Sequence, residues 1–144
     1  MSVMQIPDAR TRADLTAKIA IAAYVGAKLH LYKNDFTPSH LSVLADFIEA
    51  DFGGYAAAVV TWSAVFLDQN GVPVSTIGEI LFAMTGAPTN LVYGCYLTDA
   101  AGTGLLWSTR FDTTPVNFAV APDALPVTAQ MSLANGTVLQ SVGP

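Results

Sequence analysis

The stretch NLVYGCYLTDAAGTGLLWSTRF, residues 90–111, decides the fold. It contains two apolar segments, residues 91–97 and 105–111, and the residues between them are small and include two glycines, as a hairpin loop requires. Both segments are too apolar to leave a whole face in water. We therefore expect two strands that lie centrally in a two-layer β domain.

Further strand-like segments, separated by turn signals, lie on both sides of this hairpin. Asn70-Gly71 is a strong signal for a tight hairpin turn. The strand-like segments are residues 28–33, 55–67 with a bend at 61–63, 77–85, 116–120 and 127–133. Strands spaced by about 8 to 14 residues are typical of all-β domains. The sequence therefore predicts a mainly β fold, an antiparallel β-sandwich or barrel.

Two helices are expected beside the strands. Residues 9–23 have helical spacing after a possible cap at Asp8, although residues 19–21 also permit a strand. Residues 39–48 have the apolar spacing of a short second helix. The predicted organisation is an N-terminal arm at residues 1–7, a single β-rich domain at 8–136 and a C-terminal tail at 137–144.

The composition limits the classes of function. Only 12% of the residues are charged, and the formal net charge is −5 without a basic cluster. Nucleic-acid binding needs a basic patch that displaces counterions from phosphates, so no nucleic-acid partner is expected. The apolar runs are shorter than the roughly 20 residues that span a bilayer, and no targeting signal is visible, so we expect a soluble chain with no membrane partner. So few charges suggest a surface that is covered in an assembly.

The sequence contains no arrangement typical of a catalytic site. Cys95 is predicted to be a buried structural thiol, and His30 and His40 to be solvated residues and not metal ligands. No nucleophile motif and no phosphate-binding loop occurs. A carboxylate pair for glycoside hydrolysis stays open, because such pairs meet only in space. Trp62 and Trp107 could form a sugar platform, but core packing is favoured. We expect no enzyme, no cofactor and no metal.

Three acidic residues, Asp46, Glu49 and Asp51, precede Gly53-Gly54. Their spacing lacks the alternating oxygen ligands of a calcium loop, so capping and solvation of a loop is the favoured interpretation. Termini and loops are free to reach a partner, so the predicted contact residues are these three and the arm. The arm residues are Met1, Ser2, Val3, Met4, Gln5, Ile6 and Pro7.

The sequence resembles a set of small virion proteins of tailed phages. Four segments carry the resemblance, which covers residues 28–133: KLHLYKND at 28–35 with Thr37-Pro38, ADFIEADFGGYAA at 45–57, VYGCYLTD at 92–99 and GLLWSTRF at 104–111. The chain departs from the pattern at Ile48, where a polar residue is common, at Cys95, which replaces an aromatic residue, and at residues 108–109.

The resemblance implies a non-enzymatic capsid cement or decoration protein. Such a protein would be made in the host cytoplasm and would lie on the capsid surface, where it bridges major capsid protein subunits. We expect a homo-oligomer, with a trimer favoured, because closed symmetry covers apolar surface. The alternatives are a tail- or fibre-associated phage module and, from another class, a carbohydrate-binding module or small hydrolase.

Overall fold

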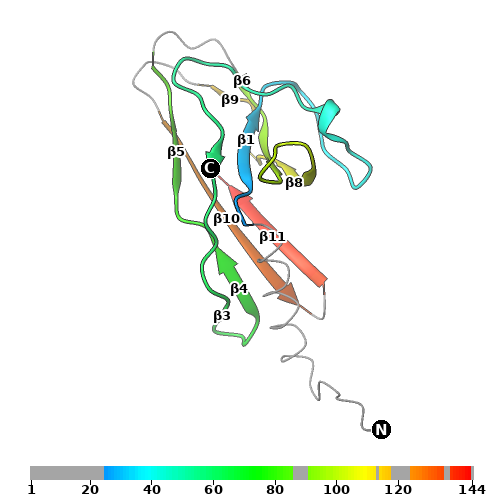
Figure 1. The fold of residues 1–144 in the computed structure, drawn as a ribbon, viewed down its shortest axis with the longest axis vertical. Coiled ribbons are helices and arrows are strands. Elements are labelled where there is room, and N and C mark those ends of the chain that lie inside the picture. The colour runs from blue at the N-terminus through cyan, green and yellow to red at the C-terminus, as the bar shows by residue number, and fades with distance from the viewer. Residues whose placement is uncertain (1–24, 86–90, 113, 118–123, 135–136, 144) are drawn as a thin grey trace, which may run out of the picture.

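The chain folds into two antiparallel β-sheets that pack face to face, and a third pair of strands extends one end (Figure 1). The computed structural model describes residues 25–85, 91–112, 114–117, 124–134 and 137–143. The first sheet holds, in spatial order, β2 (Ala58–Val59), β1 (Lys28–Tyr32), β7 (Gly94–Thr98) and β8 (Leu105–Arg110). The second holds β11 (Thr137–Gly143), β10 (Ala124–Ala134), β4 (Pro73–Thr76) and β3 (Phe66–Leu67), with β5 (Ile80–Ala83) also paired to β10. The small pair is β6 (Leu91–Val92) with β9 (Val116–Asn117).

The hairpin predicted from residues 90–111 is present as β7 and β8. Their register pairs Leu97 with Trp107 and Gly94 with Arg110. β7 lies inside the sheet between β1 and β8, as expected. The prediction that both strands are central is wrong for β8, which is the end strand of the sheet in the described part of the chain.

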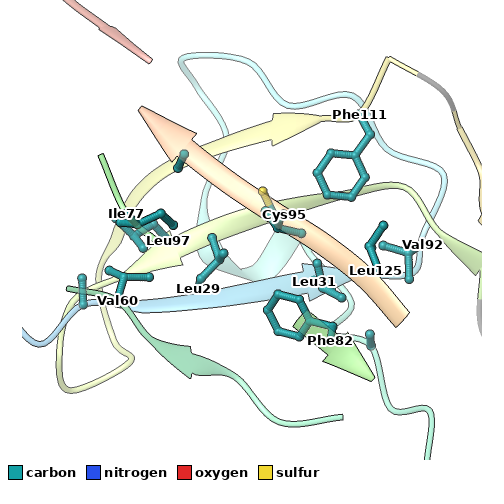
Figure 2. Packing of buried hydrophobic residues seen from close by; sticks show 14 of the residues in the cluster. Leu29, Leu31, Val60, Ile77, Phe82, Val92, Cys95, Leu97, Phe111 and Leu125 are labelled. Atoms are coloured by element: carbon teal, nitrogen blue, oxygen red, sulfur yellow. The ribbon is translucent and has the colours of Figure 1, made fainter. Parts of the chain in front are cut away.

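The core lies between the two sheets. Leu29, Leu31, Cys95 and Leu97 come from the first sheet, and all four are fully buried. They meet residues of the second sheet and the segment between β4 and β5; the members from there are Ile77, Phe82, Leu125, Val127 and Ala129 (Figure 2). At about 25 cal/mol per Å² of apolar surface removed from water, this burial is the main force that holds the sheets together.

One segment connects the two sheets at the bend that the sequence predicted. β2 pairs with β1 in the first sheet, whereas β3 pairs with β4 in the second. Between them, Trp62 forms a single bridge to Ile77. The chain therefore changes sheets at residues 60–65. β3 and β4 are joined by the expected turn, in which Gly71 has a φ of 73° and its N–H donates to the Asp68 carbonyl.

β4 and β5 follow one another along the same side of β10 and are separated by a bulge. Thr76 pairs with Gln130, but Ile80 pairs with Val127, so three residues face two across the ladder. Gly78 lies at this extra position, with no atom near the place of a Cβ. A bulge bends a sheet, and here it lets the long strand β10 follow the curvature of the fold.

The fold is mainly β, but several finer predictions differ from it. The described residues form two open sheets and no closed barrel. The predicted helix at 39–48 is reduced to one 3-10 turn, η1 (Leu44–Asp46). Residues 137–143, predicted as part of a tail, form β11, because β10 offers them seven residues of antiparallel register. The predicted N-terminal helix and arm lie outside the described residues.

Candidate functional site

The outer face of the first sheet is covered by the chain itself. Residues 33–48 cross this face and place the ring of Phe47 against Tyr96, with centroids 4.8 Å apart, and against Tyr32 at 5.2 Å. Phe36 packs edge-on against Phe47 at 5.4 Å. Together with Leu44 they form a second, smaller aromatic core. This packing explains why residues 39–48 are not a helix: an extended path is needed to place these rings on the sheet.

A chain of hydrogen bonds runs from the end of this loop into the first sheet. His30 Nδ1–H donates to Glu49 Oε1 at 2.7 Å, and His30 Nε2 lies 2.9 Å from Thr98 Oγ1. The imidazole stacks on Tyr96 with a centroid distance of 4.7 Å. The prediction of a solvated His30 is therefore wrong, since 11% of its side chain is exposed. The reason is a long-range contact: residues 48–50 pair with the end of β1 and bring Glu49 beside it.

The order hydroxyl, imidazole and carboxylate matches that of a hydrolase triad, but the geometry does not favour catalysis. Thr98 is 1% exposed, so no substrate reaches its hydroxyl. That hydroxyl also donates to the Asp99 carbonyl at 3.1 Å. This hydrogen-bonded network therefore connects the loop to the sheet through His30, Glu49 and Thr98. It does not provide an accessible nucleophile.

Tyr55 completes this network from the opposite side. Its hydroxyl donates to Glu49 Oε1 at 2.8 Å and accepts the backbone N–H of Leu31 at 3.1 Å. The Leu31 carbonyl accepts from Ala50 N, so the hydroxyl fills the one gap in the ladder along this edge of β1. Burial raises the pKa of the Tyr55 phenol well above its ordinary value, and the bond from Leu31 only partly opposes this.

The structure separates the three predicted acidic contact residues. Asp46 accepts the backbone N–H of Val43 at 2.9 Å, which is the capping role expected from the sequence. Glu49 belongs to the His30 network, and Asp51 pairs with Lys33 at 2.8 Å. Their carboxylates remain exposed, and they do not converge on one point. The predicted arm contacts, residues 1–7, lie outside the described residues.

Other candidate groups for chemistry are buried or separate. Cys95 is fully buried, and this burial raises the pKa of its thiol far above its ordinary value, as a structural cysteine requires. Trp107 is 9% exposed and packs in the core, so it is not a sugar platform. Within the described ranges, no three His, Cys, Asp or Glu side chains gather as metal ligands would. None of those residues forms a helix long and apolar enough to cross a membrane.

An open pocket of about 440 Å³ lies between the outer loop and β8. Its walls are residues of two segments, Pro38, Ser39, His40 and Ser42 on one side and Leu105, Leu106, Trp107 and Ser108 on the other. Two of its hydroxyls already serve the loop: Ser42 Oγ accepts from Ser39 N at 2.8 Å, and Ser39 Oγ accepts from Leu41 N at 3.2 Å. The pocket therefore offers a shaped, polar surface without a poised reactive group.

Apolar side chains are exposed on the same loop. Leu41, Val43 and Ile48 are 77%, 56% and 55% exposed. Val59 and Leu81 are similarly exposed elsewhere, at 63% and 60%. Single exposed apolar residues are ordinary, but three on one short loop above its own aromatic core make this loop a candidate contact surface.

Comparison of the chain with protein-family models, with curated proteins and with solved structures finds no match.

Proposed function

We propose that the chain is a non-enzymatic capsid cement protein of a tailed phage, which bridges and stabilises major capsid protein subunits. The observation that carries the proposal is the loop at residues 39–48. It presents Leu41, Val43 and Ile48 to solvent while Phe47, buried beneath it, fixes its path. A binding surface that is already ordered loses little conformational freedom on contact, as a protein that reinforces a shell requires.

The chemistry of the remaining surface supports an adhesive role over a catalytic one. The polar network of His30 ends at a buried hydroxyl, Thr98. With 12% charged residues, the chain has little surface that must stay in water. In this proposal the protein lies on the capsid surface after synthesis in the host cytoplasm, as a homo-oligomer for which a trimer is favoured. A ligand that binds only the assembled shell raises the stability of that shell by mass action.

The test uses shells that lack the protein and purified chain added back. We expect particles without the gene product to assemble but to release DNA on mild heating, and added protein to restore their resistance. The double variant Leu41→Ser, Val43→Ser should bind shells at least ten-fold more weakly. Leu81→Ser is the control, because it removes a leucine of comparable exposure, 60%, from the other sheet and should bind normally. Shells as robust without the protein, or protein found only on tails, would overturn the proposal in favour of the tail module.

A further inference from the structure

The outer edge of β8 has the geometry of a site for one more strand. Phe111 N–H donates to the Tyr93 carbonyl at 3.0 Å, so the N–H of Phe111 faces the strand that leads into β7. Along an antiparallel strand, residues that direct their backbone groups to one neighbour alternate with residues that direct them away. Thr109 and Trp107 therefore direct their backbone groups to β7. Ser108 and Arg110 direct theirs away from β7, to an edge that has no neighbouring strand within the described residues.

The pocket described above lies along this edge. Four consecutive residues of β8, 105–108, line it. Successive side chains of a strand point to opposite faces, so a wall of four consecutive residues is the edge of the strand and not one of its faces. The facing wall is formed by Pro38, Ser39, His40 and Ser42. Paired strands lie about 4.8 Å apart, so an extended segment that adds to β8 would enter this pocket.

Two of the usual protections of an edge strand are missing along β8. Exposed edges are commonly blocked by proline, by an outward lysine or by a bulge. β8 contains no proline or lysine; its bulge lies at Leu106, because Leu97 pairs with Trp107 and Thr98 with Leu105, so the edge is regular from residue 107 to residue 110. The one charged side chain of β8, Arg110, is bound to Asp35 at 2.7 Å and to the Phe36 carbonyl at 3.1 Å, both on the outer loop.

The chain itself contains a segment of suitable chemistry. Residues 2–6, Ser-Val-Met-Gln-Ile, are uncharged and end at Pro7, which cannot continue a strand ladder. The described residues begin at Val25, and at the neighbouring Gly26 an added Cβ would lie 3.1 Å from Ala100 in the turn between β7 and β8. Residues 8–24 span about 25 Å as a helix and about 55 Å when extended, enough to reach a neighbouring copy.

We propose that residues 2–6 of a second copy of this chain add to the edge of β8, between β8 and the loop at 38–42. The arm of each copy then enters the groove of the next. Such head-to-tail contacts are heterologous and close into a ring when the rotation between copies permits, which gives a basis for the trimer. The choice of a trimer rests on the proposed function, whereas the groove is argued from the structure alone.

The experiment measures oligomeric state by sedimentation and amide exchange along β8 in the full-length chain. We expect a trimer in which the amides of Ser108 and Arg110 exchange at least a hundred-fold more slowly than in a chain without residues 1–7. That deletion should be monomeric with unchanged circular dichroism. Ser108→Pro removes the outward N–H and should also be monomeric, whereas Ser108→Ala keeps it and should remain trimeric. A peptide of residues 1–7 in excess should dissociate the trimer, a result that does not depend on how the variants fold.

Three results would overturn the inference. A trimer that persists after deletion of residues 1–7 places the interface elsewhere. A monomeric full-length chain with slow β8 amides means that the arm folds back on its own copy. A monomer with fast amides means that the edge is empty. The proposed function fails separately: a trimer built by the arm that does not bind shells refutes the cement role and leaves this inference intact. A monomer that binds shells refutes this inference and leaves the cement role intact.

Discussion

Replacing Tyr55 by Phe tests whether the network behind the outer loop contributes to stability. The hydroxyl of Tyr55 accepts from Leu31 N and donates to Glu49 Oε1. Phe keeps the ring contacts, which lie at centroid distances of 5.2 Å to Phe52 and 5.9 Å to Phe82. The substitution therefore removes two hydrogen bonds and little packing.

The expected cost follows from what is left behind. Leu31 is 0% exposed, so its N–H loses its partner without access to water, and such a group costs about 1–3 kcal/mol. Glu49 has a side chain that is 44% exposed and keeps its contact with His30, so water replaces the second bond at small cost. We expect a loss of about 2 kcal/mol in the free energy of unfolding.

Urea unfolding followed by fluorescence measures this loss, as a lower midpoint with an unchanged m-value. Tyr93→Phe is the matched control. Its ring lies 5.1 Å from the guanidinium carbon of Arg110, and the substitution keeps that contact, so the stability should change by less than about 0.5 kcal/mol. If Tyr55→Phe is as mild as the control, the hydroxyl does not replace a missing strand along β1, and the reasoning is wrong.

Three further predictions concern the core and the sheets. Trp107→Ala should lower the free energy of unfolding by about 3–5 kcal/mol in chemical denaturation, because it deletes a large side chain that is 9% exposed; a loss below about 1 kcal/mol would contradict the burial. Gly94→Ala should cost about 3 kcal/mol by the same assay, since its methyl would overlap the Thr109 carbonyl and the Tyr32 ring, whereas Gly78→Ala has free space and should be tolerated. Burial raises the pKa of Tyr32 and of Tyr96 from 10.0 to about 12. Both phenols are favoured neutral in the fold, so their contribution is present below about pH 10 and is lost as the pH rises toward 12. Thermal melts between pH 9 and 12 should show this decline, and a flat profile would contradict it.

Local patterns predicted the elements that local physics determines. The tight turn at Asn70-Gly71 needs positive φ, which glycine supplies, and the structure has it at Gly71. In the predicted strand at 127–133, Val127 and Ala129 alternate with polar residues, and both are buried on the inner face. Even the change of sheet near Trp62 had a local signal, because polar and bulky residues interrupt an apolar run there.

The features that were missed depend on contacts between distant residues. β8 looked central because it is apolar on both faces, but the outer loop covers the second face and leaves the strand at the edge. His30 looked solvated because its partners are 19 and 68 residues away. Residues 39–48 have helical spacing but do not form the predicted helix, because the burial of Phe47 on the sheet outweighs a weak local propensity.

The candidate surface shows the same division between local and distant causes. Asp46, Glu49 and Asp51 were grouped because they are close in sequence, yet each carboxylate binds a different partner. Their shared effect is to fix the residues around them. Asp46 caps the turn after Val43, and Glu49 binds the end of the loop to β1. The acidic residues therefore support the contact surface more than they form it.

This support gives the exposed apolar residues their significance. A loop that was free to move would bury Leu41 and Ile48 against the nearest apolar surface, because exposure of a large aliphatic side chain costs about 1.5–3 kcal/mol relative to burial. Here the loop is held on the sheet by the ring of Phe47, which packs on Tyr32 and Tyr96, and at its end by the Glu49 network. Leu41 and Ile48 remain in solvent. The fold thus leaves apolar surface exposed that a partner can cover. A mutation that frees the loop, such as Phe47→Ala, should reduce that exposure and weaken shell binding even though it touches no residue of the surface.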